Sequence, residues 1–380
     1  MHAPAPASHR ILIVGGYGTF GSRCAERLTR AGDLDIVVAG RDAARANEAA
    51  QALRRTAAPG TRISSARIDA ERTSAADLQQ LGIGIVVNAS GPFQAQSYTL
   101  AAAAISARAH YVDLADARDF VTGIGALDAA ARAADVLVVS GASSVPGLSS
   151  AVVRHLARDI VTPEVLDIAI SPGNSFDPGL ATTRSILGYV GRPLRMLIDG
   201  RWRNVHGWQG TTRHTFPRIG TRLVAYADVP DLDLFAAHCP TLRTVRFRAG
   251  VEVAMFHFGM WAISWAVRAG LLRAPENFAG MLLAMKRRLA FLGSDKGGMM
   301  VRLSGRDASG AWRTLSFDLE ASSGHGPYIP AIASVILATR LARGELVLRG
   351  AHPCFDLVTL DEFTRAVADL DIAWQVRETS

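Results

Sequence analysis

The sequence predicts an α/β fold that begins with a doubly wound parallel sheet and continues into a second, more antiparallel domain. Three observations lead to this prediction. Apolar runs alternate with helical patterns through roughly the first 140 residues, as parallel sheets require. The first apolar run leads directly into a glycine-rich turn. From residue 163 onward, paired strands and a hairpin signal replace the alternation.

The first strand and its turn predict a binding site for a dinucleotide. Residues 11–14 are Ile-Leu-Ile-Val, which is typical of a strand buried on both faces. The glycines that follow allow a tight turn, a close approach to a pyrophosphate and close helix packing, in that order. Residues 23–30 continue as a helix whose first amides, from about Thr19, would face phosphate oxygens. The predicted cofactor residues are Gly16, Tyr17, Gly18, Thr19, Phe20 and Gly21. The alternative is a glycine-rich turn without a ligand.

The end of the second strand, residues 35–42, indicates which dinucleotide binds. An NAD site normally places an acid there to accept hydrogen bonds from the ribose. This chain has Gly40 and then Arg41, and a guanidinium complements a 2′-phosphate. We therefore expect NADP(H) in preference to NAD(H), with Arg45 as a second contact. The alternative is that Arg41 only ends a surface loop.

The remaining elements of the first domain follow in regular alternation. Asp69, at the end of the third strand, is placed to contact the adenine or to cap the next turn. Small residues end the fourth strand and leave room for the nicotinamide, namely Asn88, Ala89, Ser90 and Gly91. The expected strands are 62–68, 84–88, 110–116 and 136–141, and the expected helices are 41–55, 74–81, 96–109 and 119–134.

The second domain is expected to mix strands and helices. Asp199-Gly200 between two short strands is a strong hairpin signal. Pro327 suits an early position of the last helix, 327–341. The other expected strands are 165–170, 211–216, 221–225, 244–254, 299–304 and 312–321, and the other helices are 180–189, 255–269 and 277–291.

Composition excludes several function classes. The net charge of +7 comes from dispersed arginines, so we expect no nucleic-acid partner. Three scattered cysteines form neither a disulfide framework nor a metal site, and we expect no metal and a cytoplasmic location. Residues 255–272 are apolar and near the minimum spanning length. His257 and Arg268 favour a buried helix there, and membrane or lipid contact is the less favoured alternative.

Three residues are candidates for catalysis. Asp113 ends a sheet strand, where ligands bind in open sheets, although an N-cap or a structural hydrogen bond would explain it equally well. His325 and Tyr328 lie in a glycine-flanked turn before a helix and could donate a proton, or the turn could simply begin the helix. For a substrate carboxylate we nominate Arg184, Arg213 and His214.

The combined motifs resemble the saccharopine dehydrogenase-like (saccharopine reductase-like) family. They are the glycine turn 14–21, Asn-Ala-Ser-Gly-Pro-Phe at 88–93, Tyr-Val-Asp-Leu-Ala at 111–115 and Ser-Val-Pro-Gly-Leu at 144–148. Gly-His-Gly-Pro-Tyr at 324–328 and Gly-Ala-His-Pro-Cys at 350–354 also look like motifs of its bacterial members. True saccharopine reductases usually have an Asp where this chain has Val145, which weakens the transfer of saccharopine as substrate.

The resemblance implies a Rossmann-like NAD(P)-binding domain with an inserted α+β substrate and dimerisation domain. We expect the first domain in residues 1–148, the insertion in 149–325 and a return of 326–380 to the first domain. The implied activity is hydride transfer to or from a C–N or C=O centre of a small, amino-acid-derived substrate. We also expect the protein to be a homodimer. The alternatives are a reductase of an apolar, lipid-like ketone or enone, and a non-catalytic dinucleotide-binding scaffold.

Overall fold

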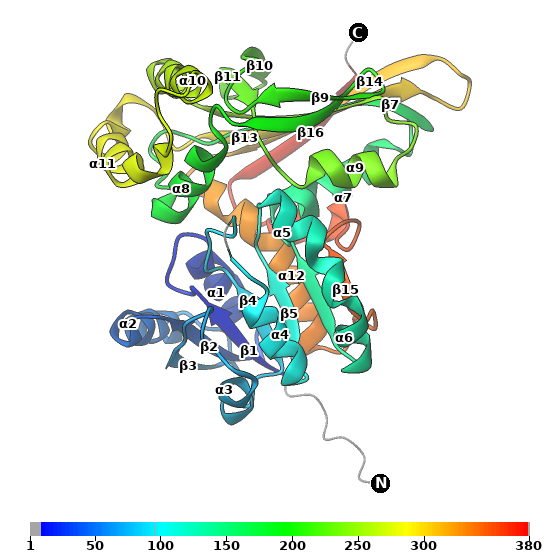
Figure 1. Ribbon diagram of the computed structural model, residues 1–380. Helices are drawn as coiled ribbons and strands as arrows, with labels where there is room; N and C mark the ends of the chain where they lie inside the picture. The colour runs from blue at the N-terminus through cyan, green and yellow to red at the C-terminus, as the bar shows by residue number, and fades with distance from the viewer. Residues whose placement is uncertain (1–8, 95, 379–380) are drawn as a thin grey trace. The chain divides into compact units, whose positions relative to one another are not determined.

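The computed structural model describes residues 9–94 and 96–378 and divides the chain into two units (Figure 1). The first unit contains residues 1–147 and 328–358, and the second contains 148–327 and 359–380. Each unit has its own sheet. Because both units are assembled from separate stretches of chain, neither is completed before the polypeptide has left it and returned.

The first unit is built on a parallel sheet, as the alternation of apolar runs predicts. Its strand order is β15-β6-β5-β4-β1-β2-β3. The order reverses between β1 and β4, and this is the switch point at which open sheets bind ligands. The strands are β1 (Arg10–Val14), β2 (Asp35–Gly40), β3 (Arg62–Arg67), β4 (Ile85–Asn88), β5 (His110–Asp113), β6 (Leu137–Ser140) and β15 (Gly350–Pro353).

Helices pack on this sheet and bury its apolar strands. Helix α12 (Ile329–Ala342) is apolar around most of its circumference and almost wholly buried. It contacts α1 (Gly21–Arg30), where Cys24 Sγ lies 2.9 Å from Ser334 Oγ. The other helices of the unit are α2 (Ala43–Arg54), α3 (Ala75–Gln80), α4 (Thr99–Ser106), α5 (Arg118–Thr122), η1 (Gly123–Leu127) and α6 (Asp128–Ala133).

One long helix expected over 119–134 is instead three short segments, α5, η1 and α6. The break falls at Gly123 and Gly125. Glycine costs an α-helix about 1 kcal/mol relative to alanine, so two glycines in three residues favour a tighter 3₁₀ turn here.

The second unit contains a nine-stranded mixed sheet whose path is β10-β11-β12-β7-β13-β14-β16, with β8 paired to β12 and β9 to β8. Among the strands that the structure describes in this sheet, β7 and β12 pair in parallel and the other pairs are antiparallel. Phe216 and Ile219, at the tip of the β10–β11 hairpin, pack on Ala169 and Met300. The strands are β7 (Thr162–Ser171), β8 (Pro193–Ile198), β9 (Arg201–His206), β10 (Thr212–Phe216), β11 (Gly220–Tyr226), β12 (Thr244–Val251), β13 (Gly297–Arg306), β14 (Trp312–Ala321) and β16 (Ile372–Glu378).

The helices of the second unit form two groups. In Figure 1, α8, α10 and α11 gather at one end of its sheet, whereas α7 contacts β13, β14 and α13. The helices are α7 (Ser149–Leu156), α8 (Gly179–Tyr189), α9 (Asp231–His238), α10 (Ala254–Arg268), η3 (Pro275–Phe278), α11 (Ala279–Arg288), η4 (Ala290–Leu292) and α13 (Leu360–Ala366). Two short segments, η2 (Ser144–Leu148) and η5 (Gly326–Tyr328), lie where the chain passes from one unit to the other. No helix among the described residues is long and apolar enough to cross a bilayer.

The C-terminal segment differs from the expectation that 326–380 returns whole to the first domain. Residues 328–358 belong to the first unit, but 359–380 belong to the second. The reason is β16, which pairs antiparallel with β14 along its whole length and stacks Trp374 on Phe317 at 5.5 Å between ring centroids. The end of the chain therefore forms the edge strand of the second sheet.

Candidate functional site

The glycine turn between β1 and α1 is closed so tightly that side chains would not fit. A Cβ on Gly21 would lie 2.1 Å from the carbonyl oxygen of Gly15, and one on Gly16 would lie 2.9 Å from Val38 Cγ1 of β2. The amide of Gly18 donates to Gly15 O at 2.8 Å. Each glycine of the pattern therefore meets a specific steric demand, and backbone rather than side chain faces the space above the turn.

The start of α1 is suited to a phosphate. Phe20 precedes the helix without a side-chain cap, and the first turn contains no acidic residue. Thr19 lies immediately before it in the turn. The positive end of the helix dipole is therefore not offset by a carboxylate from the helix itself, which favours an anion at this position.

The loop after β4 packs against the glycine turn. A Cβ on Gly15 would lie 2.8 Å from Ala89 O. Asn88 is buried, and its Oδ1 accepts hydrogen bonds from the Ser90 amide at 3.0 Å and the Ser90 hydroxyl at 2.5 Å. Asn88 therefore fixes the conformation of the loop that leads to Gly91. The structure brings these predicted cofactor residues to the same switch point as the glycine turn.

Tyr17 occupies the position where an NAD site would carry an acid. Its ring lies against Gly40, where a Cβ would be only 2.5 Å from the ring, and its hydroxyl accepts from the Asp42 amide at 3.0 Å. The Arg45 guanidinium lies 4.6 Å from the ring centroid. A carboxylate at position 40 would therefore require Tyr17 to move.

Three arginines gather at this end of β2. Arg41 is exposed and directly follows the strand, and its carbonyl accepts a hydrogen bond from Arg67 Nε at 3.2 Å. Arg45 completes the group over the Tyr17 ring. Arg67 was not among the predicted residues. The parallel register that pairs Gly40 with Arg67 places it there, and a comparison of the ends of the two strands could have found it.

Asp69 is engaged in a local turn. Its Oδ1 accepts from the Glu71 amide at 3.2 Å, and its carbonyl accepts from Thr73 Oγ1 at 2.7 Å. This contact corresponds to the turn-capping alternative of the sequence analysis. The adenine contact of Asp69 stays a prediction.

Asp113 lies fully buried at the end of β5. Its Oδ1 accepts from the Ser140 hydroxyl at 2.9 Å, the Gly141 amide at 2.8 Å and the Ala115 amide at 3.0 Å. Burial raises the pKa of Asp113 to about 6, although these hydrogen bonds oppose the rise. The carboxylate joins the ends of β5 and β6, which is the structural hydrogen-bond alternative. Its catalytic role stays a prediction.

Tyr328 contacts α1. Its hydroxyl donates to Glu26 Oε2 at 2.6 Å, and the Arg23 guanidinium lies 5.2 Å from its ring centroid. Burial and then the hydrogen bond to Glu26 raise the pKa of Tyr328. The phenol is therefore held in its protonated form at neutral pH. Neither Glu26 nor Arg23 was among the predicted residues, because their helical pattern alone does not indicate this partner.

His325 belongs to the second unit. Its Nδ1 accepts a hydrogen bond from the Asp371 amide at 2.7 Å, so the ring joins the turn before η5 to the segment before β16. The neighbouring Gly324 amide donates to Asp295 Oδ2 at 2.7 Å. These contacts do not test the predicted role of His325 as a proton donor.

The three predicted substrate residues do not form one cluster. Arg184 is exposed on α8, and Arg213 and His214 are neighbours on β10, so their side chains point to opposite faces of the strand. His214 is buried, and its Nε2 lies 3.0 Å from Asp318 Oδ1. Arg377 donates to the other oxygen of Asp318 at 2.6 Å.

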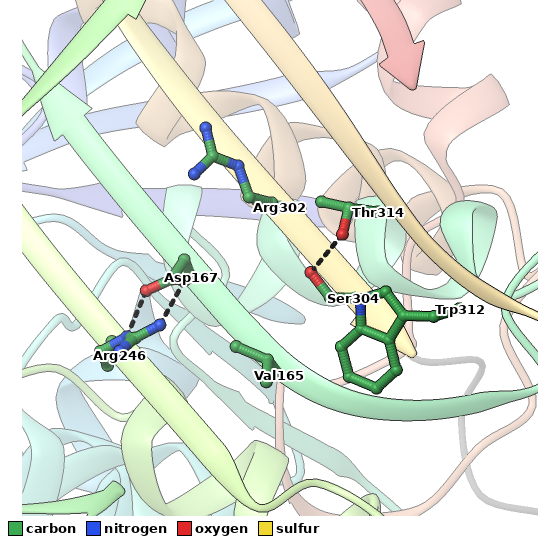
Figure 2. A pocket seen from close by; sticks show the side chains of 7 residues that line it. All are labelled: Val165, Asp167, Arg246, Arg302, Ser304, Trp312 and Thr314. Carbon is green, nitrogen blue, oxygen red and sulfur yellow. Dashed lines mark hydrogen bonds and ion pairs between the residues drawn. The ribbon is translucent and has the colours of Figure 1, made fainter. Parts of the chain in front are cut away.

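A hollow of about 340 Å³ lies on one face of the second sheet. Figure 2 shows Arg246 paired to Asp167, Ser304 hydrogen-bonded to Thr314, and Arg302 without a bond to the other residues drawn. The two Arg246 bonds measure 2.6 and 2.8 Å. The remaining lining residues are Val165 and Trp312.

The hollow carries more positive than negative charge. Arg248 also donates to Asp167, at 3.1 Å. Burial would raise the pKa of Asp167, but Arg246 and Arg248 outweigh it and hold the pKa below its usual value. With Arg302, three arginines surround one carboxylate, so the hollow suits an anion. The sequence did not reveal it because its residues come from four separate strands.

No group of three or more His, Cys, Asp or Glu side chains within residues 9–94 and 96–378 is arranged to hold a metal ion. Cys354 is buried, and burial raises the pKa of its thiol. It is therefore a packed thiol.

Comparison with known proteins identifies the first unit. Residues 11–139 match the family model described as the saccharopine dehydrogenase NADP binding domain. No curated protein matches the sequence. The matched segment contains the glycine turn, the arginines after β2 and the loop after β4, so the domain match and the geometry concern the same site.

Solved structures match over nearly the whole chain. Apo saccharopine dehydrogenase (L-Glu forming) from Saccharomyces cerevisiae is similar with a TM-score of 0.69 and 12% identity, over 98% of this chain and 100% of the other. A probable dehydrogenase from Thermotoga maritima matches with a TM-score of 0.43 and 12% identity, over 94% and 93%. The first likeness shows the fold, and the second is too distant to add to it. Together the two findings show that residues 11–139 match a saccharopine dehydrogenase NADP binding domain and that the chain has the saccharopine dehydrogenase fold, which supports an NAD(P)-dependent oxidoreductase.

Proposed function

We propose that the protein prefers NADP(H) and transfers hydride to or from a C–N or C=O centre of a small substrate derived from an amino acid. The observation that carries the cofactor preference is the end of β2. There the Tyr17 ring fills the space beside Gly40, and Arg41, Arg45 and Arg67 surround it. This arrangement leaves no acid at position 40 to bind the ribose, since the Asp42 carboxylate caps α2, and it provides cations for a 2′-phosphate.

The residues of the first unit fit such a cofactor. The glycine turn exposes backbone over the start of α1, where the diphosphate would be held, and Ala89 and Ser90 lie beside the turn. When bound, the nicotinamide supplies the hydride chemistry. The protein must bind and orient the substrate and provide a proton. We assign the proton to Tyr328, whose raised pKa keeps the phenol protonated, with Asp113 and His325 as the other candidates.

Substrate recognition is proposed to involve a carboxylate. Arg184 and Arg213 are exposed in the second unit and are free of the buried pairing that occupies His214. A guanidinium binds a carboxylate through two parallel hydrogen bonds. We also propose a homodimer and a cytoplasmic location, and light scattering on the purified chain tests the first of these.

The cofactor preference is tested by calorimetric titration with NADPH and NADH. Loss of a charge-assisted contact costs about 1.5 to 3 kcal/mol, so Arg41→Ala should weaken NADPH binding by roughly ten-fold or more and leave NADH binding nearly unchanged. Arg55→Ala is the matched control, because Arg55 is an exposed arginine at the opposite end of α2. Equal losses for the two cofactors would contradict the proposal.

Activity is tested by NADPH oxidation with a panel of imines and ketones that differ only in carrying a carboxylate or an ester. Turnover of the carboxylates alone supports an amino-acid-derived substrate. Turnover of apolar ketones or enones would favour the lipid-like alternative, and cofactor binding without turnover of any compound would favour the scaffold.

A further inference from the structure

Helix α10 buries its polar residues and exposes its aromatic ones. Its buried side chains are His257, whose Nε2 lies 3.2 Å from Thr211 Oγ1, and Ser264, which donates to Trp261 O at 2.7 Å. Phe258, Trp261 and Trp265 are 55%, 42% and 44% exposed. Most soluble helices have the opposite arrangement. The outer face of α10 is therefore built for an environment other than water.

Helix α11 and the η3 turn repeat the pattern. Phe278, Met281 and Met285 are 45%, 62% and 45% exposed. Their spacing equals that of Phe258, Trp261 and Trp265, so each set forms one stripe along its helix. Both stripes end in an exposed arginine at the same interval, Arg268 on α10 and Arg288 on α11.

The two stripes lie at the same end of the second unit, and we refer to them and their exposed apolar neighbours together as the apolar patch. Of 17 exposed large apolar side chains in the described part of the chain, ten lie between residues 255 and 292. Only residues 269–274 separate α10 from η3, and α11 packs on α8 at the same end of the unit (Figure 1). The apolar patch comprises Met255, Phe258, Trp261, Trp265, Leu271, Phe278, Met281, Met285, Phe291 and Leu292.

Basic residues accompany the patch. Between residues 255 and 292 the chain has one acid, Glu276, which is paired with Arg192 at 3.1 Å. The same stretch has five cations, namely Arg268, Arg273, Lys286, Arg287 and Arg288. Arg287 is paired with Asp177 at 2.8 Å, and Arg268 lies 4.9 Å from the Trp265 ring centroid. Lys286 donates to the carbonyls of Asn174 and Phe176 and is not part of the rim. The positive rim of the patch therefore consists of the exposed Arg268, Arg273 and Arg288.

We propose that the apolar patch docks on the surface of a membrane that contains anionic lipid. Tryptophan is enriched at the membrane interface between headgroups and acyl chains, and the long side chains of Lys and Arg extend their charged groups toward the headgroups there. An amphipathic helix with an apolar face and Lys or Arg beside it lies in that boundary. Neither helix is long enough to span the bilayer, so both lie along it.

Charge decides between a membrane and a second copy of the chain. A two-fold interface places the same patch on both partners, so it would bring one positive rim against another. An anionic lipid surface instead complements the rim. The cations therefore favour lipid as the occupant of the patch.

Vesicle sedimentation tests the proposal with the full chain. We expect co-sedimentation with vesicles of phosphatidylcholine and phosphatidylserine, weaker binding to phosphatidylcholine alone, and loss of binding as salt is raised. The double variant Trp261→Ser/Trp265→Ser should reduce the bound fraction by about ten-fold. Arg273→Glu/Arg288→Glu should reduce binding only to the anionic vesicles.

Two matched variants control for general effects. Trp202 is an exposed tryptophan of β9, 41% exposed, and Arg201 is an exposed arginine beside it. Trp202→Ser and Arg201→Glu should leave vesicle binding unchanged, and thermal unfolding followed by circular dichroism verifies that each variant is folded. Absence of vesicle binding by the wild type overturns the proposal. So does a dimer in light scattering that the double tryptophan variant abolishes, because the patch would then be a protein interface.

Discussion

Asp231 is a fully buried acid in the first turn of α9. Burial raises its pKa from 3.8 to about 7. Because the pKa of the folded state lies above that of the unfolded chain, the contribution of Asp231 to stability is complete below about pH 4 and is lost as the pH rises through about 7. At higher pH the folded protein must hold a buried carboxylate.

We therefore expect Asp231→Asn to stabilise the protein more at pH 8 than at pH 4. The amide has the shape of the protonated acid but does not ionise, and the difference between the two pH values should reach up to about 4 kcal/mol. Urea unfolding of wild type and variant at both pH values measures it. A variant that changes stability equally at pH 4 and pH 8 would show that Asp231 does not titrate with folding.

Asp307 provides a control with the opposite sign. It is exposed, and hydrogen bonds from Ser309, with smaller contributions from Ala311, lower its pKa. Stability from this acid is present at neutral pH and is lost as the pH falls through its lowered pKa. Asp307→Asn should accordingly destabilise the protein at pH 8 and have a smaller effect in acid.

Single residues also show where inference from the sequence ends. The glycines of the turn and the arginine after β2 were identified because their chemistry follows from local spacing. The contact of Tyr17 with Gly40 was not, because the two residues lie 23 positions apart and the ring orientation depends on how the turn packs on β2. The burial of His214 against Asp318 was missed for the same reason.

At the scale of elements, the close approach of the β1 turn to α1 leaves no room for a single added carbon atom. Gly21 begins the helix with its Cα against the carbonyl of Gly15. The neighbouring atoms are backbone, so they cannot rotate away as a flexible side chain would. Any added side chain must displace the helix from the strand.

We expect Gly21→Ala to destabilise the first unit by about 1 to 3 kcal/mol and to weaken NADPH binding. Gly188→Ala is the contrasting variant, because Gly188 lies in α8 with no atom within 4 Å of an added Cβ. It should stabilise the protein by about 0.5 to 1 kcal/mol through helix propensity. Denaturant unfolding measures both changes in stability as shifts of the midpoint at an unchanged m-value. A Gly21→Ala variant as stable as the wild type would refute the packing argument.

Elements were predicted well where their pattern is local. The strands of the first sheet follow from apolar runs, and their positions agree with the structure. The strand expected over 244–254 ends at Val251 in the structure, because Ala254 already belongs to α10. Helix α9 and strand β16 were not expected, since short elements with mixed composition acquire their structure from the surface on which they pack.

At the scale of the whole molecule, the cofactor residues and the apolar patch lie in different units. A ligand that binds only the folded first unit stabilises that unit by mass action, by about 2.7 kcal/mol at a hundred times its dissociation constant. The second unit has its own sheet and core and gains nothing directly from the cofactor.

We expect calorimetric unfolding to show two transitions, of which NADPH raises only one. Gly21→Ala should lower that same transition, which assigns it to the first unit. A single transition that NADPH shifts as a whole would instead show that the two units unfold together.

The fold class could be predicted as a whole, because alternating strands and helices leave few topologies open. The division of the C-terminal segment could not. Whether residues 359–380 join the first or the second unit depends on which sheet offers an edge to β16, and edges are a property of the assembled sheet. The arginine-lined hollow likewise exists only once β7, β12, β13 and β14 are adjacent.

The late position of β15 has a consequence for biosynthesis. This strand completes the edge of the first sheet by pairing with β6, yet residues 141–349 are translated between the two. At typical elongation rates that interval lasts roughly 10 to 40 s. Throughout it, the nascent chain presents β6 as an open edge, the kind of surface on which polypeptides aggregate. Ribosomes that stall between residues 148 and 327 would release chains whose first unit has its cofactor residues but lacks both α12 and β15.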